Sequence, residues 1–275
     1  MSAIESIIMA FAGVVVSLLF FRYMMLKPSN DRSWVNDNDK LANADFEGDF
    51  VTIKNIRDFN WRSTRDYDER WIEKKFNLNE VTKIWFILEY FDPKKRQMAH
   101  TILGFEFKDG SRICCSIEVR RERGEKYHPI RGFFKQYELI YVWATERDVI
   151  GVRTRCRRKS VTHLFEAIVL GPGNERRMLE SYLNRTNKLF KSPEWYNTMT
   201  NTCTTNIVNH VNEVYPGRVP RAIAIFLPGL SPKILYKNNL VKIDTSIENT
   251  LEKSIIDDKA KDWDGESDFG NFIRE

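Results

Sequence analysis

Residues 100–120 read HTILGFEFKDGSRICCSIEVR, and this stretch decides the fold. Apolar and polar side chains alternate on both sides of Asp109-Gly110, a dipeptide that favours the tight turn of a β-hairpin. Similar patterns predict further strands at residues 49–56, 81–90, 137–143, 148–155 and 161–169. From residue 174 the apolar spacing changes to three and four, which predicts helices at residues 174–190 and 204–215. We therefore expect an α+β fold in which an antiparallel sheet packs against helices.

An apolar run from Ile7 to Leu26 precedes this domain. At 1.5 Å per residue the run is about 30 Å long, which matches the hydrocarbon core of a bilayer if Arg22 reaches toward the headgroups. A cleavable signal peptide fits less well, because residues 1–6 contain Glu5 and no basic residue. The sequence predicts one retained transmembrane helix. Arg22 and Lys27 follow its apolar part, so the positive-inside tendency favours a cytoplasmic main domain.

The charge composition limits which classes of partner are expected. The 275 residues include 43 basic and 38 acidic residues, for a net charge of +5. No basic stripe interleaved with aromatic residues is evident, so we expect no nucleic-acid partner and regard a membrane surface as the better candidate. We expect an anchor at residues 1–27, a linker at 28–48, one catalytic domain at 49–245 and a charged, loosely ordered tail at 246–275.

A thiol surrounded by small polar residues begins the second predicted helix. Residues 201–206 read NTCTTN, and Asn201 or Thr202 can serve as the N-cap. A helix N-terminus lowers the pKa of a thiol and can hold an oxyanion, which makes Cys203 a candidate nucleophile. The alternative is a small buried cysteine with a structural role. The remaining cysteines show neither the spacing of a disulfide scaffold nor that of a metal site, and they are Cys114, Cys115 and Cys156.

An imidazole at the start of the first hairpin strand is the candidate base. Pairing in the hairpin brings Ser116 and Glu118 onto the strand next to His100, where either side chain could orient the ring. Arg120 shares the face of Glu118, so it could bind a phosphate or pair with that carboxylate. A hydrogen-bonded structural histidine is the alternative for His100. Three other histidines compete for the role of base, and they are His128, His163 and His210. The last lies seven residues beyond Cys203, about 10 Å along the same helix, which is too far to activate the thiol.

Several short motifs together resemble a known family. They are PSNDRSW at residues 28–34, NIRDF at 55–59, AHT at 99–101, SIEVRRE at 116–122, ERDVI at 146–150 and CTT at 203–205. Their order and spacing resemble the DUF4105 family, which includes the N-terminal domain of the Lnb-type bacterial lipoprotein N-acyltransferases. The likeness covers about residues 28–240. The resemblance implies a permuted NlpC/P60 (papain-like) architecture, with Cys203 at the position of the nucleophile and His100 at that of the base. One departure is Asn201, which lies two residues before Cys203 where the family pattern puts an Asn directly before it.

The resemblance also implies an activity. It is the transfer of a fatty acyl chain from a membrane phospholipid, through a thioester on Cys203, to the N-terminal amine of a lipoprotein's diacylglyceryl-cysteine. Ser116, Glu118 and Asn201 would support the site and Arg120 would bind the donor. No cofactor and no metal would take part. The family implies a single-pass protein of the bacterial inner (cytoplasmic) membrane with a periplasmic catalytic domain, against the orientation that Arg22 and Lys27 favour.

Two other classes of function stay open. A papain-like peptidase or amidase of the NlpC/P60 type would use the same Cys–His pair on a peptide of the cell wall. A membrane-bound binding module would need neither side chain. Loss of activity on replacing Cys203 separates both enzymes from the binding module, and dependence on phospholipid separates the acyltransferase from the peptidase.

Overall fold

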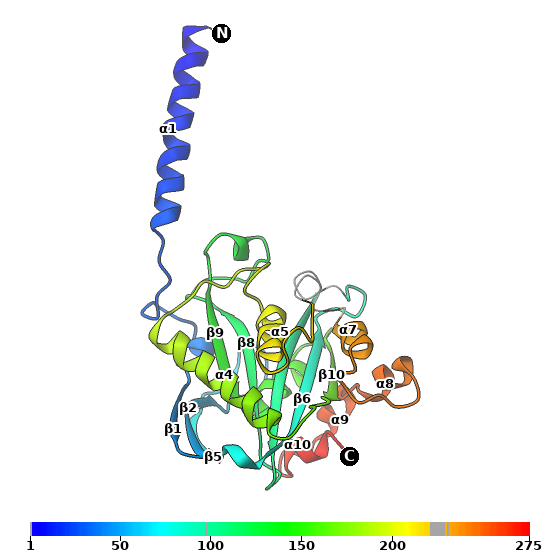
Figure 1. The fold of residues 1–275 in the computed structure, drawn as a ribbon. Helices are drawn as coiled ribbons and strands as arrows, with labels where there is room; N and C mark the ends of the chain where they lie inside the picture. Colours follow the sequence, from blue (N-terminus) through cyan, green and yellow to red (C-terminus); the bar gives the residue numbers. More distant parts are fainter. Residues whose placement is uncertain (1, 97, 221–228, 230) are drawn as a thin grey trace.

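The computed structural model describes residues 2–96, 98–220, 229 and 231–275 (Figure 1). Helix α1 (Ala3–Met25) extends away from the rest of the chain as a single rod. A reciprocal capping box between Ser2 and Glu5 satisfies backbone donors at its start. Its apolar window has a mean hydropathy of 2.3 and none of it is buried against the protein, so α1 is long and apolar enough to cross a membrane.

An eight-stranded sheet forms the centre of the domain. The strands lie in the order β1 (Asn43–Glu47), β2 (Phe50–Arg57), β9 (Glu138–Ala144), β8 (Arg112–Arg120), β7 (Ala99–Phe107), β6 (Val81–Tyr90) and β10 (Val161–Glu166), and β5 (Trp71–Asn77) also pairs with β2. Neighbours are antiparallel except β2 and β9. The predicted hairpin is confirmed: β7 and β8 pair with Ile102 opposite Ser116 and Gly104 opposite Cys114.

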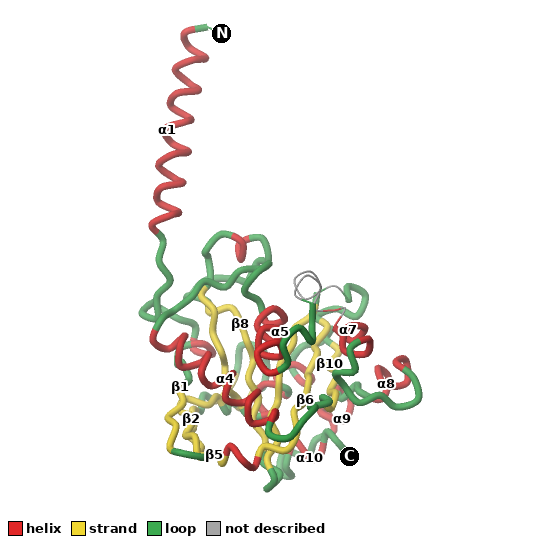
Figure 2. Tube along the Cα trace, viewed as in Figure 1, coloured by secondary structure: helices red, strands yellow, loops and turns green. Residues whose placement is uncertain are grey.

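Helices cover both faces of this sheet, as Figures 1 and 2 show. Helices α4 (Asn174–Lys191) and α5 (Cys203–Val214) lie on one face, where Leu103 and Phe105 of β7 enter the main hydrophobic core. On the other face Ile102 of the same strand packs in a second core. The helices of that second face are α2 (Glu146–Val149), α3 (Gly151–Arg155), α9 (Asp257–Asp262) and α10 (Phe269–Phe272). The fold is thus mixed α/β in three layers, and a charged group inside it needs a partner.

Smaller elements complete the part of the chain that the structure describes. Strands β3 (Asn60–Trp61) and β4 (Tyr67–Asp68) form a separate two-stranded ribbon. The remaining elements are η1 (Asn36–Asn38), η2 (Leu78–Glu80), η3 (Arg131–Phe133), α7 (Ser231–Lys237) and α8 (Ile247–Lys253).

The strand predicted at residues 148–155 is wrong, because this segment forms α2 and α3. The Thr145 hydroxyl accepts a hydrogen bond from the Asp148 N–H and starts a helix where alternation suggested an extended chain. Val149 and Ile150 are fully buried in the second core. A short apolar run reads alike as a buried strand and as a buried helical turn, and here the cap decides.

The segments expected to be a linker and a loosely ordered tail contain regular structure. Residues 43–47 of the expected linker form β1, and Trp34 before them is buried. The tail expected to be loosely ordered forms α8, α9 and α10, because Ile256, Ala260 and Phe269 fill the second core. The folded unit therefore extends beyond residues 49–245 in both directions, while residues 97, 221–228 and 230 within that range lie outside the described residues.

The last turn of the chain is held by an ion pair. Arg274 donates to both carboxylate oxygens of Glu146 in α2, at 2.8 and 2.6 Å, and its guanidinium stacks on the Trp85 ring. Since Glu146 is buried, this pairing supplies the counter-charge that its carboxylate needs.

A second buried pair joins the sheet to α2. The carboxylate of Asp148 accepts the single hydrogen of Arg57 Nε, shared between its two oxygens at 3.1 Å each, and a hydrogen bond from Nη2 at 2.9 Å. It also accepts from the Phe59 N–H at 2.7 Å and from Trp61 Nε1 at 3.1 Å. Both charged side chains are almost fully buried. Asp148 therefore fixes the end of β2, the ribbon beyond it and the first turn of α2 against each other.

Replacing Asp148 by Ala is expected to destabilise the domain by about 3–5 kcal/mol, because it removes the one carboxylate that is hydrogen-bonded to the buried guanidinium of Arg57 among the residues described. The measurement is the thermal unfolding midpoint of the full chain in detergent. Asp66→Ala is the matched control, since it breaks an arginine–aspartate pair that lies in solvent and should leave the midpoint unchanged. Equal midpoints for the two variants would contradict this role of Asp148.

Candidate active site

Helix α5 presents the candidate thiol at its first residue, Cys203. Thr202 is the N-cap: its hydroxyl accepts from the Thr205 N–H at 3.2 Å, and the Thr205 hydroxyl accepts from the Thr202 N–H at 2.7 Å. The structure thus selects Thr202 from the two N-cap residues that the sequence left open. Asn201 instead bridges, donating to the Trp195 carbonyl at 2.9 Å and accepting from Asn206 at 2.8 Å. It holds the segment before α5 in place and its hydrogen bonds do not involve His100.

The pKa of Cys203 is lowered to about 6. Burial raises this pKa, but the charge and hydrogen bond of His100 lower it more, and hydrogen bonds from the side chain and backbone of Thr101 add to the effect. The geometry agrees with this proximity: the Thr204 hydroxyl lies 3.8 Å from Cys203 Sγ and 3.4 Å from the hydroxyl of Thr101, the residue after His100. The three other cysteines are free thiols whose pKa values burial raises, and they are Cys114, Cys115 and Cys156. Of the four cysteines, Cys203 is the one poised as a thiolate near neutral pH.

His100 is oriented by its neighbours on β8. Its Nε2 lies 2.8 Å from the Ser116 hydroxyl, and that hydroxyl donates to Glu118 Oε1 at 2.6 Å. Because the single hydroxyl hydrogen goes to Glu118, the Ser116 oxygen accepts the hydrogen of Nε2. Nδ1 is then the ring nitrogen left to take the proton of the thiol. Ser116 and Glu118, both expected to support the ring, lie where the hairpin register predicted.

A row of buried charges continues behind Glu118. Arg153 of α3 contacts Glu118 at 2.9 Å and Glu89 of β6 at 3.0 Å, and Arg157 contacts Glu89 at 2.7 Å. Burial raises the pKa of Glu118, but Arg153, Arg57 and His100 outweigh it and lower that pKa well below its usual range. Glu118 therefore stays ionised, and its carboxylate lies 3.9 Å from His100 Nε2.

Sequence reasoning missed the acid and the arginine of this row. Glu89 is the second-last residue of β6, follows the apolar run at residues 84–88 and lies opposite His100 in the sheet. A carboxylate directly after an apolar run and next to a candidate base was a usable signal. Arg153 was hidden because residues 148–155 were predicted as a strand, whereas a helix turns this guanidinium inward.

The guanidinium of Arg120 is not free to bind a phosphate. Its side chain is buried, donates to the Asn38 and Asp39 carbonyls at 2.9 and 2.6 Å, and stacks on the Trp34 ring at 4.2 Å. These contacts fasten the segment that follows α1 to the end of β8. The prediction that Arg120 binds the acyl donor is therefore not supported, because its donors already have partners.

The other histidines occupy different positions. His163 contacts Ser254 and the Leu251 carbonyl, and burial lowers its pKa to about 4. His210 lies between Tyr141 and Ser181, and burial lowers its pKa to about 3. His128 accepts from the Ile130 N–H in a loop. Among the residues described, no group of three or more His, Cys, Asp or Glu side chains could hold a metal ion.

Contacts connect the candidate thiol to the base of α1. Lys135 donates to the Tyr23 carbonyl at 3.3 Å and stacks on the Tyr23 ring. The loop carrying η3 meets the segment before α5 where Thr198 donates to the Pro129 carbonyl at 2.8 Å. Figure 1 shows this loop and the α4–α5 connection on the side of the domain nearest α1. Ile130 and Phe134 are exposed there, at 62% and 61%. The thiol thus lies toward the side from which the apolar helix leaves.

The lowered pKa gives a pH-dependent prediction. The thiolate of Cys203 forms as pH rises through about 6, so its alkylation by iodoacetamide should reach a plateau by about pH 7, where an unperturbed thiol of pKa near 8.5 is still mostly protonated. His100→Ala should move the midpoint upward, because it removes the group whose charge and hydrogen bond lower the pKa of Cys203. Glu118→Gln should move it in the same direction, because it removes the carboxylate that holds His100 in place through Ser116. The measurement is the rate of alkylation at Cys203 against pH by peptide mass spectrometry.

Cys156 serves as the internal control, since its partly buried thiol has a raised pKa and should react only at higher pH. A midpoint for Cys203 that is the same in the wild type and in His100→Ala would show that the imidazole does not act on the thiol.

Comparison with known families adds one finding. Residues 67–227 match the family model of the Lnb N-terminal periplasmic domain, which is more than half of the chain and includes both His100 and Cys203. No curated protein and no solved structure matches the chain. The expected Lnb-type likeness is confirmed.

Together with α1, this domain indicates a single-pass membrane protein with a periplasmic domain. The family therefore does not support the cytoplasmic orientation that Arg22 and Lys27 favour. The chain belongs to the family of proteins that carry the Lnb N-terminal periplasmic domain.

Proposed function

We propose that this protein is a thiol acyltransferase that moves a fatty acyl chain from a membrane phospholipid to the N-terminal amine of a lipoprotein's diacylglyceryl-cysteine. The observation that carries the proposal is the pair of His100 and Cys203, with the thiol at a helix N-terminus and its pKa lowered to about 6. The match to the Lnb N-terminal domain supports it. A bacterial inner-membrane location and a permuted NlpC/P60 (papain-like) arrangement of the thiol, base and sheet belong to the same proposal.

The first half-reaction acylates the thiol. His100 Nδ1 accepts the proton of Cys203, and the thiolate attacks the carbonyl carbon of the phospholipid ester. In this proposal the backbone N–H of Cys203, in the first turn of α5, donates to the oxyanion, a contribution of about 3 kcal/mol per donor. The C–O bond then breaks, the lysophospholipid oxygen takes the proton from His100, and the acyl chain is left as a thioester on Cys203.

The second half-reaction transfers the chain. The lipoprotein's α-amine attacks the thioester carbonyl, the C–S bond breaks, and an amide forms while Cys203 leaves as a thiolate and His100 takes up the amine proton. This sequence predicts ping-pong kinetics. The Ser116–Glu118 pair holds the ring in the tautomer that the first step needs, and Glu118 stabilises the imidazolium. The anchor raises the effective concentration of both lipid substrates, since all three stay in one membrane.

The test uses the purified full chain in phospholipid vesicles with labelled acyl chains and a synthetic diacylglyceryl-cysteine peptide. We expect a hydroxylamine-labile label on the protein and an N-acylated peptide product. Cys203→Ala should remove both, and His100→Ala should lower the rate of transfer by about 10²-fold or more. Cys156→Ala is the matched control, because this thiol is not beside an imidazole base, and it should keep full activity.

The alternatives have distinct outcomes. A label that persists in Cys203→Ala would contradict the mechanism. Hydrolysis of a cell-wall peptide without any dependence on lipid would favour the NlpC/P60-like peptidase or amidase. Product formed from the lipopeptide in the absence of phospholipid would show that the acceptor's own ester supplies the chain, which contradicts the proposed donor while retaining the thioester chemistry.

A further inference from the structure

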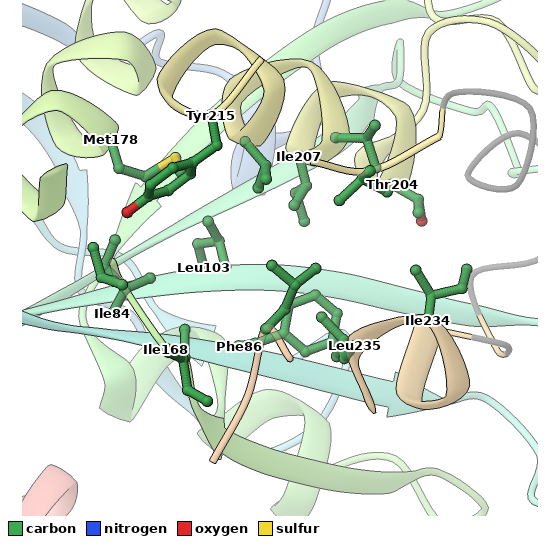
Figure 3. Close-up of a pocket in the computed structure, with 16 residues that line it drawn as sticks. Ile84, Phe86, Leu103, Ile168, Met178, Thr204, Ile207, Tyr215, Ile234 and Leu235 are labelled. Carbon is green, nitrogen blue, oxygen red and sulfur yellow. The ribbon is translucent and has the colours of Figure 1, made fainter. Parts of the chain in front are cut away.

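An apolar groove runs along α5 beside the candidate thiol (Figure 3). We call it the α5 groove. One wall is formed by Thr204, Ile207 and Val211 of α5 and by Tyr215, the residue that follows α5. Leu103 of β7 and Ile84 and Phe86 of β6 form the opposite wall, and Ile234 and Leu235 of α7 lie near the Thr204 end. The groove leaves about 90 Å³ in which the centre of a water molecule can lie.

That volume is large for an apolar space inside a folded domain. About 10–15 Å³ by this measure suffices for one water molecule, but a water needs two to four polar partners, and apolar cavities of this kind stay dry and bind hydrocarbon. Thr204 and Tyr215 are the lining residues that carry a side-chain hydroxyl, and they lie at opposite ends of the α5 wall. The chemistry of the lining therefore selects a hydrocarbon chain.

One end of the groove lies next to the thiol, at Thr204. The hydroxyl of Thr204 lies 3.8 Å from Cys203 Sγ and 3.4 Å from the Thr101 hydroxyl, and the same Thr204 side chain lines the groove. A chain attached to the sulfur through a carbonyl can thus enter the groove past one side chain. At the far end the Tyr215 hydroxyl donates to the Leu170 carbonyl at 2.7 Å and accepts from the Leu170 N–H at 2.9 Å, so the Tyr215 ring is fixed there. Figure 3 shows Tyr215 and Met178 together at this end.

We propose that the α5 groove holds the acyl chain of the substrate and of the thioester, and that the fixed ring of Tyr215 at its far end limits the length of the chain. This inference rests on the proposed function and assigns the substrate's hydrocarbon part to a site. From Thr204 to Tyr215 the helix rises about 16 Å at 1.5 Å per residue, which takes roughly 13 carbons of an extended chain at about 1.25 Å each.

The length limit is tested by narrowing the groove. Val211 lies seven residues after Thr204, about 10 Å along α5, which corresponds to roughly eight carbons. In Val211→Phe the longest chain that fits should therefore fall from about 13 to about eight carbons. Asn209→Phe adds the same ring on the exposed face of the same helix and is the matched control. Val211→Met narrows the groove with a more flexible side chain and should cause a smaller shift in the same direction.

The probes are alkyl methanethiosulfonates with methyl, hexyl, dodecyl and hexadecyl chains, applied to the full chain in detergent. The Cys203 thiolate attacks the sulfenyl sulfur, a disulfide to the alkylthio group forms, and methanesulfinate leaves, so the readout does not need acyl transfer. Peptide mass spectrometry gives the rate at Cys203. We expect the dodecyl reagent to react at least tenfold faster than the methyl reagent in the wild type and in Asn209→Phe, and this advantage to be lost in Val211→Phe while that of the hexyl reagent is kept.

Identical chain-length profiles in the wild type, Val211→Phe and Val211→Met would overturn the inference. The same variants, given a mixture of phospholipids with C8 to C16 chains, separate this inference from the proposed function. Acyl transfer with an unchanged profile would reject the groove as the chain site and keep the acyltransferase. The expected alkylation profile without any acyl transfer would keep the groove and reject the acyltransferase.

Discussion

The ionised carboxylate of Glu118, inside a sheet that helices cover on both faces, is the constraint on which the site depends. A carboxylate at this depth is stable only with counter-charges, and Arg153 supplies the nearest at 2.9 Å. Arg153 can reach it because residues 151–155 form a helix on the second face of the sheet. Once Glu118 is fixed and charged, Ser116 has one acceptor for its hydroxyl hydrogen, and His100 has one nitrogen left for the thiol. The ring nitrogen of His100 that carries the hydrogen is thus set by packing on the opposite side of the sheet.

The sequence was sufficient for the parts that depend on local pattern. The Asp-Gly turn with alternation on both sides specified β7 and β8 and their register, and that register placed Ser116 and Glu118 beside His100. Helical spacing and a polar cap specified α5 and the thiol at its start. Cys203 and His100 were proposed as nucleophile and base from their residue types and expected elements, and the family likeness supported the pairing. No local pattern encodes the contact itself, because about a hundred residues separate the two.

The parts that failed depend on contacts between distant segments. Residues 148–155 read as a strand because alternation of apolar residues does not report a single capping hydroxyl at Thr145. Arg120 read as a ligand because a sequence does not show that two carbonyls and an indole ring already surround it. The tail read as disordered because its charge hides the few apolar residues that dock on the second core, such as Ile256 and Phe269. In each case tertiary packing outweighs composition.

Arg274 closes a salt bridge with Glu146 and packs on Trp85 of β6, so one of the outermost layers of the domain is built from residues near 274. During synthesis these residues leave the ribosome after every strand has already emerged. Until then the carboxylate of Glu146 and the apolar residues around Ile102 and Phe269 cannot be enclosed. The second core of this domain is therefore closed only once the residues near 274 have emerged, and the sheet built before that point still exposes apolar surface on this face.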